Sequence, residues 1–140
     1  MRNDVYLAGY ADPEWRAEFK DKVARDVIVF DSFDHNYASL TPGGKAELIA
    51  KELENINDCE LVVFYLCKEW DSSYSMIQLG DTVGQGRRVI VYVENGMDSE
   101  EKIVRYCEYR GIIVVSSMED LIENVEEYLA QTELAKSLFD

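Results

Sequence analysis

The feature that most constrains the fold of this 140-residue sequence is a regular alternation of short apolar runs with amphipathic ones. The apolar runs are continuous and rich in β-branched or aromatic residues, which is typical of strands buried on both faces. They occupy residues 5–8, 27–30, 61–66, 89–93 and 112–115. Strands that alternate with helices in this way predict a parallel sheet with right-handed crossovers. We therefore expect an α/β three-layer sandwich of the flavodoxin or Rossmann-like type, with a five-stranded parallel sheet and helices on both faces.

Helical patterns fill the intervals between these strands. In the first, Trp15, Phe19 and Val23 recur every four residues behind Asp12 and Pro13, a capping residue followed by a proline suited to the first helical turn. The last helix keeps an apolar stripe through an acidic run, formed by Met118, Leu121, Ile122, Val125, Tyr128 and Leu129. No linker, repeat or low-complexity stretch divides the chain, so we expect residues 1–140 to form a single domain.

The charge balance excludes several classes of partner. The chain has 28 Asp and Glu against 14 Lys and Arg, a formal net charge of -14. Such a surface repels phosphate backbones and anionic headgroups, so we expect no binding to duplex nucleic acid or membranes. No apolar run approaches the ~20 residues that cross a bilayer, and the start lacks a signal-peptide pattern. Cys59, Cys67 and Cys107 form no CxxC pair, which fits free thiols in a cytoplasmic protein.

In sheets of this kind, ligands bind beyond the carboxyl ends of the strands, which points to residues 8–12, 31–44 and 67–75. The second of these segments exceeds the ~2–6 residues of an ordinary strand-to-helix connection, so we expect it to be functional. Its residues Asp31, Asp34 and His35 raise the possibility of a magnesium or transition-metal site. Because no further ligand follows at a telling spacing, a polar loop is favoured, and we expect no metal and no other cofactor.

A carboxylate occupies an unusual place on the second predicted helix. Leu48, Ile49, Leu53 and Ile56 mark its core-facing stripe, and at ~100° per residue Glu52 projects inside that stripe. A carboxylate in apolar surroundings loses hydration, which raises its pKa, and such acids concentrate at catalytic sites. A long side chain near a helix end can equally reach solvent or an arginine. Periodicity alone leaves both interpretations open.

An ordered set of short motifs resembles the nucleoside 2-deoxyribosyltransferase-like family. Residues 5–9, Val-Tyr-Leu-Ala-Gly, are similar to that family's first strand and turn, and residues 52–54, Glu-Leu-Glu, to its acidic helix. Most specific are residues 72–80, Ser-Ser-Tyr-Ser-Met-Ile-Gln-Leu-Gly, which match a family pattern Ser-Pro-x-Thr-Leu-Leu-Glu-Leu-Gly. A Gly-Arg turn at residues 86–87 follows, and residues 103–112 are similar to the family's fourth helix and its entry into the last strand.

The resemblance implies cleavage of the N-glycosidic bond of a 2'-deoxynucleoside or its monophosphate, by hydrolysis or by transfer to another base. A glutamate attacks the anomeric carbon, as in retaining glycoside hydrolysis. By position, that nucleophile is replaced here by Gln78, Tyr6 would orient the nucleophile, and Glu52 would be an acidic residue of the same site. The residues to which we assign substrate binding are Gly9, Tyr10, Arg16, Asp31, Ser72, Ser73 and Ser75.

The same resemblance bears on the ligand and on assembly. Ser72 stands where the transferases have a carboxylate and the monophosphate hydrolases a phosphate-binding serine. Hydroxyls and free backbone amides at a helix start favour an anion, so we expect a nucleoside monophosphate ahead of a free nucleoside. Members of the family form homodimers or larger homo-oligomers, so we also expect self-association.

Gln78 departs from the family at the centre of the site. An amide is neutral and a poor nucleophile, so the usual glycosyl-enzyme is not expected. The chain could be a natural nucleotide binder, could carry a substrate-trapping substitution, or could use another carboxylate. Periodicity places Gln78 away from the face of Met76, Gly80 and Val83, so an exposed polar residue explains it equally well. We predict an N-glycosidase or deoxyribosyltransferase-like enzyme, with a catalytically inactive nucleotide-binding or sequestering protein as the alternative.

Overall fold

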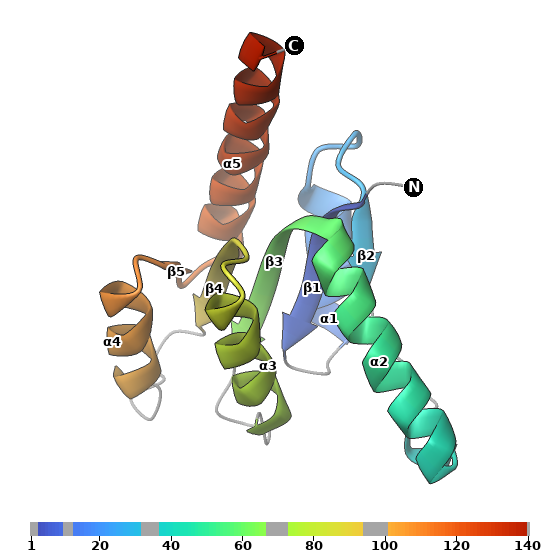
Figure 1. Ribbon diagram of the computed structural model, residues 1–140. Coiled ribbons are helices and arrows are strands. Elements are labelled where there is room, and N and C mark those ends of the chain that lie inside the picture. The colour runs from blue at the N-terminus through green and yellow to red at the C-terminus, as the bar shows by residue number, and fades with distance from the viewer. Residues whose placement is uncertain (1–2, 10–12, 32–36, 67–72, 94–100, 140) are drawn as a thin grey trace.

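The computed structural model describes residues 3–9, 13–31, 37–66, 73–93 and 101–139. Its elements in chain order are β1 (Asn3–Gly9), α1 (Pro13–Lys22), β2 (Val29–Asp31), a short 3-10 helix η1 (Tyr37–Ser39), α2 (Pro42–Asp58), β3 (Cys59–Leu66), α3 (Ser73–Gly84), β4 (Val89–Val93), α4 (Glu101–Tyr109), β5 (Ile113–Val115) and α5 (Met118–Phe139). The strands pair in parallel throughout and form one five-stranded sheet in the order β2-β1-β3-β4-β5 (Figure 1).

Helices cover both faces of this sheet. On one face, α1 and α5 bury Phe19 and Leu121 against the strands. On the other, α2, α3 and α4 bury Ile56, Leu79 and Cys107. The alternation of side chains along each strand supplies both cores, because successive residues point to opposite faces. The predicted α/β three-layer sandwich is therefore confirmed, and so is its five-stranded parallel sheet.

The two edge strands correct one sequence-based expectation. We expected all five apolar runs to be buried on both faces, but β2 covers only Val29–Asp31 and is half-buried along its length. At the other edge, Ile113 of β5 is 46% exposed. The burial of β1, β3 and β4 agrees with the expectation, and these are the strands with a neighbour on each side. Apolar composition predicts a strand well but does not reveal its place in the sheet.

Local signals set where the helices begin. α2 starts at Pro42 behind Thr41, whose Oγ1 accepts a hydrogen bond from the backbone N–H of Gly44 at 3.1 Å. This satisfies one of the amide donors that a helix start leaves without an intrahelical acceptor. α1 starts at Pro13 as predicted, while its expected cap, Asp12, lies outside the described residues.

The strand order identifies the part of the sheet suited to a ligand. The chain moves from β1 to β2 on one side and then to β3 on the other, so the order reverses between β1 and β3. Sheets with this order bind ligands outside the carboxyl ends of the strands at that reversal. Gly9 ends β1 there, opposite Tyr65 of β3. Its φ of 98° is strained for any other residue, and a Cβ would clash with the backbone oxygen and nitrogen of Tyr65.

Candidate functional site

A buried arginine ties together the carboxyl ends of β1 and β2. The Nη1 of Arg16, on α1, donates to the carbonyl of Leu7 at 2.9 Å and to Oδ1 of Asp31 at 2.7 Å. Its Nη2 donates to the carbonyl of Gly9 at 3.4 Å. Lys20, one turn further along α1, donates to the other oxygen of Asp31 at 2.9 Å. The Arg16 side chain is 4% exposed and Asp31 is 19% exposed, so this ion pair is largely shielded from water.

The electrostatics of Arg16 show which predicted residues lie near it. Burial lowers the pKa of its guanidinium, and the charge of Asp31 and the hydrogen bond to it offset part of that shift. The carboxylate of Glu52 favours the charged guanidinium as Asp31 does, and the phenol of Tyr6 lies within electrostatic range of it. The structure therefore brings Tyr6, Arg16, Asp31 and Glu52 into one electrostatic neighbourhood at the predicted edge of the sheet.

Tyr6 points to the face of the sheet that α2 and α3 cover. It is fully buried, and its ring stacks on Phe30 of β2 with centroids 5.5 Å apart. The ring is thus fixed by packing beneath the carboxyl ends of the strands. This placement is compatible with the predicted role of Tyr6 in orienting a neighbouring group, which stays a prediction.

Glu52 is half-buried on α2 and is held from α3. The hydroxyl of Tyr74 donates to Oε2 of Glu52 at 3.0 Å. This hydrogen bond links the first turn of α3 to the C-terminal half of α2. Neither end of the hydrogen bond is deeply buried, since Tyr74 is 46% exposed. The core-facing stripe predicted for this helix is confirmed at Ile56, which is buried. It is wrong at Leu53, whose side chain is 39% exposed.

The inward face of α3 is partly polar, and Gln78 lies on it. Ser75, Gln78 and Thr82 are 8%, 6% and 2% exposed, while Ile77 is 72% exposed. The alternative that Gln78 is an exposed polar residue is therefore wrong, as is the inward position expected for Gly80, which is exposed. Because α3 packs on β1 and β3, this polar face lies against the strands that flank the reversal.

The hydrogen-bonding capacity of that face remains largely available. Thr82 Oγ1 donates to the backbone carbonyl of Gln78 at 2.7 Å, a contact within the helix itself. Among the residues that the structure describes, the Gln78 side-chain amide has no hydrogen-bond partner, but it is not one of the fully buried polar groups left without one. The amide is therefore available to a ligand or to water.

Other predicted site residues are placed only in part. Ser73 is the first residue of α3, and Ser75 lies in the same turn. Tyr10 and Ser72 lie outside the described residues, as do Asp34, His35 and Cys67, so these predictions are untested. Residues 32–36 of the segment 31–44 lie outside the described residues, and the expected functional role of the segment is likewise untested.

Sequence reasoning missed two residues of this neighbourhood, Lys20 and Tyr74. Lys20 stands four residues after Arg16 on the same helix, and this spacing places both cations on one side of α1 toward a shared carboxylate. Tyr74 lies inside the motif that carries the family resemblance, yet its partner is 22 residues away in the chain. No local pattern would have paired them.

The described part of the chain contains neither a metal-ligand cluster nor a membrane-spanning helix. Within it, no group of three or more His, Cys, Asp or Glu side chains is positioned to hold a metal ion. In those same residues, no helix combines the length and apolar character needed to cross a membrane. Cys59 and Cys107 are buried free thiols, as predicted, and burial raises the pKa of Cys59 to about 12.

A sheet of order 2-1-3-4-5, with polar side chains gathered at the reversal, defines the class of doubly wound α/β proteins that bind ligands at the carboxyl edge. The family model described as "Nucleoside 2-deoxyribosyltransferase like" matches residues 2–97 of this chain. Since that match covers more than half of the chain, the protein belongs to this family. Residues 103–112, which we also compared with the family, lie outside the match.

A solved structure supports the fold independently. The chain is similar to a protein described as "conserved protein from Enterococcus faecalis V583", with a TM-score of 0.64 and 18% sequence identity. The similarity covers 91% of this chain and 99% of the other. At that identity it establishes the shared fold alone. No curated protein matches this sequence.

Proposed function

We propose that this protein binds a deoxynucleoside or its 5'-monophosphate at the carboxyl edge between β1 and β3 and acts on the N-glycosidic bond, by hydrolysis or by deoxyribosyl transfer. The observation that carries this proposal is the burial of Gln78 on the inward face of α3. The family resemblance implies that the reacting carboxylate stands at this position. A side chain 6% exposed at the strand reversal is well placed to meet a bound ligand.

The polarity of α3 supports a ligand in preference to a purely structural role. A helix that packs on a sheet ordinarily turns apolar residues inward, because burying polar groups costs free energy. Here Ser75 and Gln78 are buried while Ile77 faces solvent. The first turn of α3 also contains no acidic residue, so the positive end of the helix dipole is available to an anion. These features favour a monophosphate, and the predicted phosphate contact of Ser72 belongs to this proposal.

The chemistry at the anomeric carbon depends on which carboxylate is present. With glutamate at position 78, its oxygen would bond to C1' as the C1'–N bond breaks and the departing base takes a proton from an acid. Water or another base would then break the glycosyl ester. An amide cannot form that ester. In the chain with Gln78, we assign this role to Glu52, whose Oε2 accepts a hydrogen bond from the hydroxyl of Tyr74.

The second candidate function is binding or sequestration of the same ligand without cleavage. Gln78 itself favours it, because glutamine retains the size and hydrogen-bonding shape of glutamate without its charge. A buried amide of this kind would hold a nucleotide while leaving the glycosidic bond intact. Cytoplasmic location and self-association accompany both candidates as predictions.

The test compares the chain with Gln78 and its Gln78→Glu variant. Each is incubated with the four deoxynucleoside monophosphates, free base is measured by chromatography, and binding is measured by calorimetry. Gln85→Glu is the matched control, because Gln85 is exposed and follows the same helix. Base release by the chain with Gln78 supports an enzyme, and release by Gln78→Glu alone supports a binder with a disabled site. Absence of both release and binding in every variant contradicts the proposal.

A further inference from the structure

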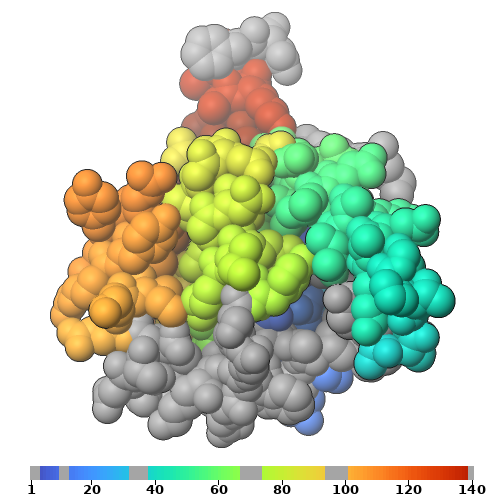
Figure 2. Space-filling model, turned by 60° about the horizontal axis from the view of Figure 1, so that its bottom comes forward, coloured from blue at the N-terminus to red at the C-terminus, as the bar shows by residue number. Residues whose placement is uncertain are grey.

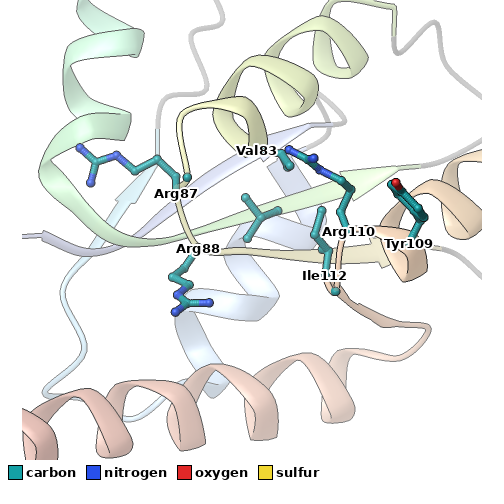
Figure 3. A pocket seen from close by; sticks show the side chains of 9 residues that line it. Val83, Arg87, Arg88, Tyr109, Arg110 and Ile112 are labelled. Carbon is teal, nitrogen blue, oxygen red and sulfur yellow. The ribbon is translucent and has the colours of Figure 1, made fainter.

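A pocket lined by arginines lies at the opposite edge of the sheet from the proposed ligand site. It has a volume of about 570 Å³ and lies where the chain enters β4 and β5 (Figure 3). This volume is in the ~300–1,000 Å³ range of small-molecule sites. Arg87, Arg88 and Arg110 supply its charge, and within the described residues no carboxylate lines it. In a chain with twice as many acidic as basic residues, this is an unusual local concentration of positive charge.

Two helix ends of the same kind frame this pocket. Helices α2, α3 and α4 lie side by side on one face of the molecule (Figure 2), and the chain leaves both α3 and α4 through residues of the pocket. After α3, the N–H of Gly86 donates to the carbonyl of Val83 at 3.0 Å, and after α4 that of Gly111 donates to the carbonyl of Glu108 at 3.1 Å. Both glycines have a positive φ, 77° and 72°, which this type of helix ending favours. Hydrogen bonds therefore fix the backbone around the pocket.

Within the described residues, one of the three arginines of the pocket has a structural partner and two have none. Arg87 donates to the backbone carbonyl of Asn57 at the end of α2, a role that cations often take at helix ends. In the same part of the chain, Arg88 and Arg110 make neither a hydrogen bond nor an ion pair. Figure 3 shows Arg110 extending toward Val83 of α3, whereas Arg88 extends to the side of the sheet where α5 lies. A ligand that contacts both must therefore extend around the start of β4.

The positive charge of the pocket exceeds what the adjacent helix ends require. The C-terminus of a helix carries about −0.5 of an elementary charge, so the ends of α3 and α4 together supply about −1. The three arginines supply three positive charges, which leaves an excess of about two. Cations held close to one another repel, so this excess costs free energy. An anion that carries two or more negative charges would remove that cost.

We propose that this pocket binds a small, extended polyanion of the diphosphate or triphosphate class. One phosphate group would lie beside Arg110 and a second beside Arg88, on either side of the start of β4. The planar guanidinium group donates two parallel hydrogen bonds to phosphate oxygens, which makes arginine well suited to such a ligand. A long polyanion would meet the net charge of -14 along its whole length, whereas a small one meets mainly the pocket.

Two sources share this chemistry, free inorganic polyphosphate and the polyphosphate tail of a nucleotide. Tyr109 bears on the choice, because its ring is 86% exposed where it lines the pocket and offers a surface on which a base can stack. If a nucleotide is the ligand, ATP should bind more tightly than inorganic tripolyphosphate, and Tyr109→Ala should remove the difference. If the free anion is the ligand, the two probes should bind equally well and Tyr109→Ala should have no effect.

The test uses isothermal titration calorimetry with inorganic tripolyphosphate. In about 50 mM salt we expect the unsubstituted chain to bind it with a dissociation constant below about 1 mM, and in about 500 mM salt to bind it more weakly. Arg88→Gln/Arg110→Gln should raise the dissociation constant at least about tenfold, or about 1.4 kcal/mol. Lys102→Gln/Arg105→Gln is the matched control, because it also removes two positive charges but from a part of α4 outside the pocket. It should change the constant less than about twofold.

Two further measurements complete the test. All four substituted side chains are exposed, so the urea midpoints of both double variants should stay within about 0.5 M of the unsubstituted chain. Inorganic phosphate is too compact to meet both arginines and should bind at least about tenfold more weakly than tripolyphosphate. Absence of tripolyphosphate binding, binding that Arg88→Gln/Arg110→Gln leaves unchanged, an equal loss in the control variant, or equal affinity for inorganic phosphate would each overturn the proposal. None of these readouts requires binding of a deoxynucleoside monophosphate, so the outcome is independent of the proposed function.

Discussion

Replacing Arg16 by methionine is expected to destabilise the fold strongly and to loosen the carboxyl ends of β1 and β2. The substitution keeps much of the apolar stem but removes the donors to Leu7, Gly9 and Asp31. Two backbone carbonyls then lose a charged donor in a site where the Arg16 side chain is only 4% exposed. The three contacts should be lost together.

The expected loss of stability in Arg16→Met depends on the burial of the Arg16–Asp31 pair and on Lys20, the second cation that contacts Asp31. Breaking a buried ion pair by removing one partner costs roughly 3–5 kcal/mol. Asp31 is 19% exposed and retains its bond to Lys20, so we place the cost for Arg16→Met at the lower end, about 3 kcal/mol. Lys20→Met is the matched control. Lys20 contacts the same carboxylate but is 45% exposed, and exposed pairs contribute about 0–1 kcal/mol.

Urea denaturation followed by circular dichroism measures both variants. With a slope of about 1.5 kcal/mol per molar urea, Arg16→Met should lower the midpoint by about 2 M and Lys20→Met by less than about 0.7 M. Equal shifts for the two variants, or a loss below about 1 kcal/mol for Arg16→Met, would refute the role assigned to the buried guanidinium.

Three further predictions concern backbone geometry, a helix cap and the thiols. Gly9→Ala should cost at least about 2 kcal/mol in urea denaturation, because of its positive φ and the clash with β3, whereas Gly80→Ala, which has open space, should cost nothing. Thr41→Ala should cost about 1 kcal/mol in the same assay. Burial raises the pKa of Cys59 from 9.0 to about 12, and that of Cys107 upward, so a disulfide reagent at pH 8 should label neither until urea unfolds the chain. The unfolded chain releases the Cys59 proton at lower pH than the folded chain, so stability should fall as pH rises from about 9 to about 12.

The fold was predictable because its signal is carried by short-range patterns. Each strand is a compact apolar run, and the helix at residues 118–139 keeps its stripe through Leu121 and Val125, both fully buried. The alternation of strands and helices then leaves few topologies. What the patterns could not give was the place of each strand in the sheet, since Ile113 lies in as apolar a run as the central strands do.

The sequence allowed us to predict which segments contribute to the site but not which side chains contact one another. Periodicity misassigned Gln78 because it assumes that the inward face of a helix is apolar, and here Ile77 faces out while Ser75 faces in. The pairing of Arg16 with Asp31 spans 15 residues, and that of Tyr74 with Glu52 spans 22. Such pairs depend on how the sheet brings distant helices and strands together. A short stretch of sequence does not carry this information.

The measurement that tests the central claim most directly is a crystal structure of the chain with Gln78 in complex with a deoxynucleoside monophosphate. An amide at position 78 cannot form the glycosyl ester, so any cleavage by this chain should be slow and the nucleotide should persist long enough to be seen. The proposed function predicts its anomeric carbon beside the Gln78 amide, with its phosphate at the start of α3. A nucleotide bound anywhere else, or absent at saturating concentration, would contradict it.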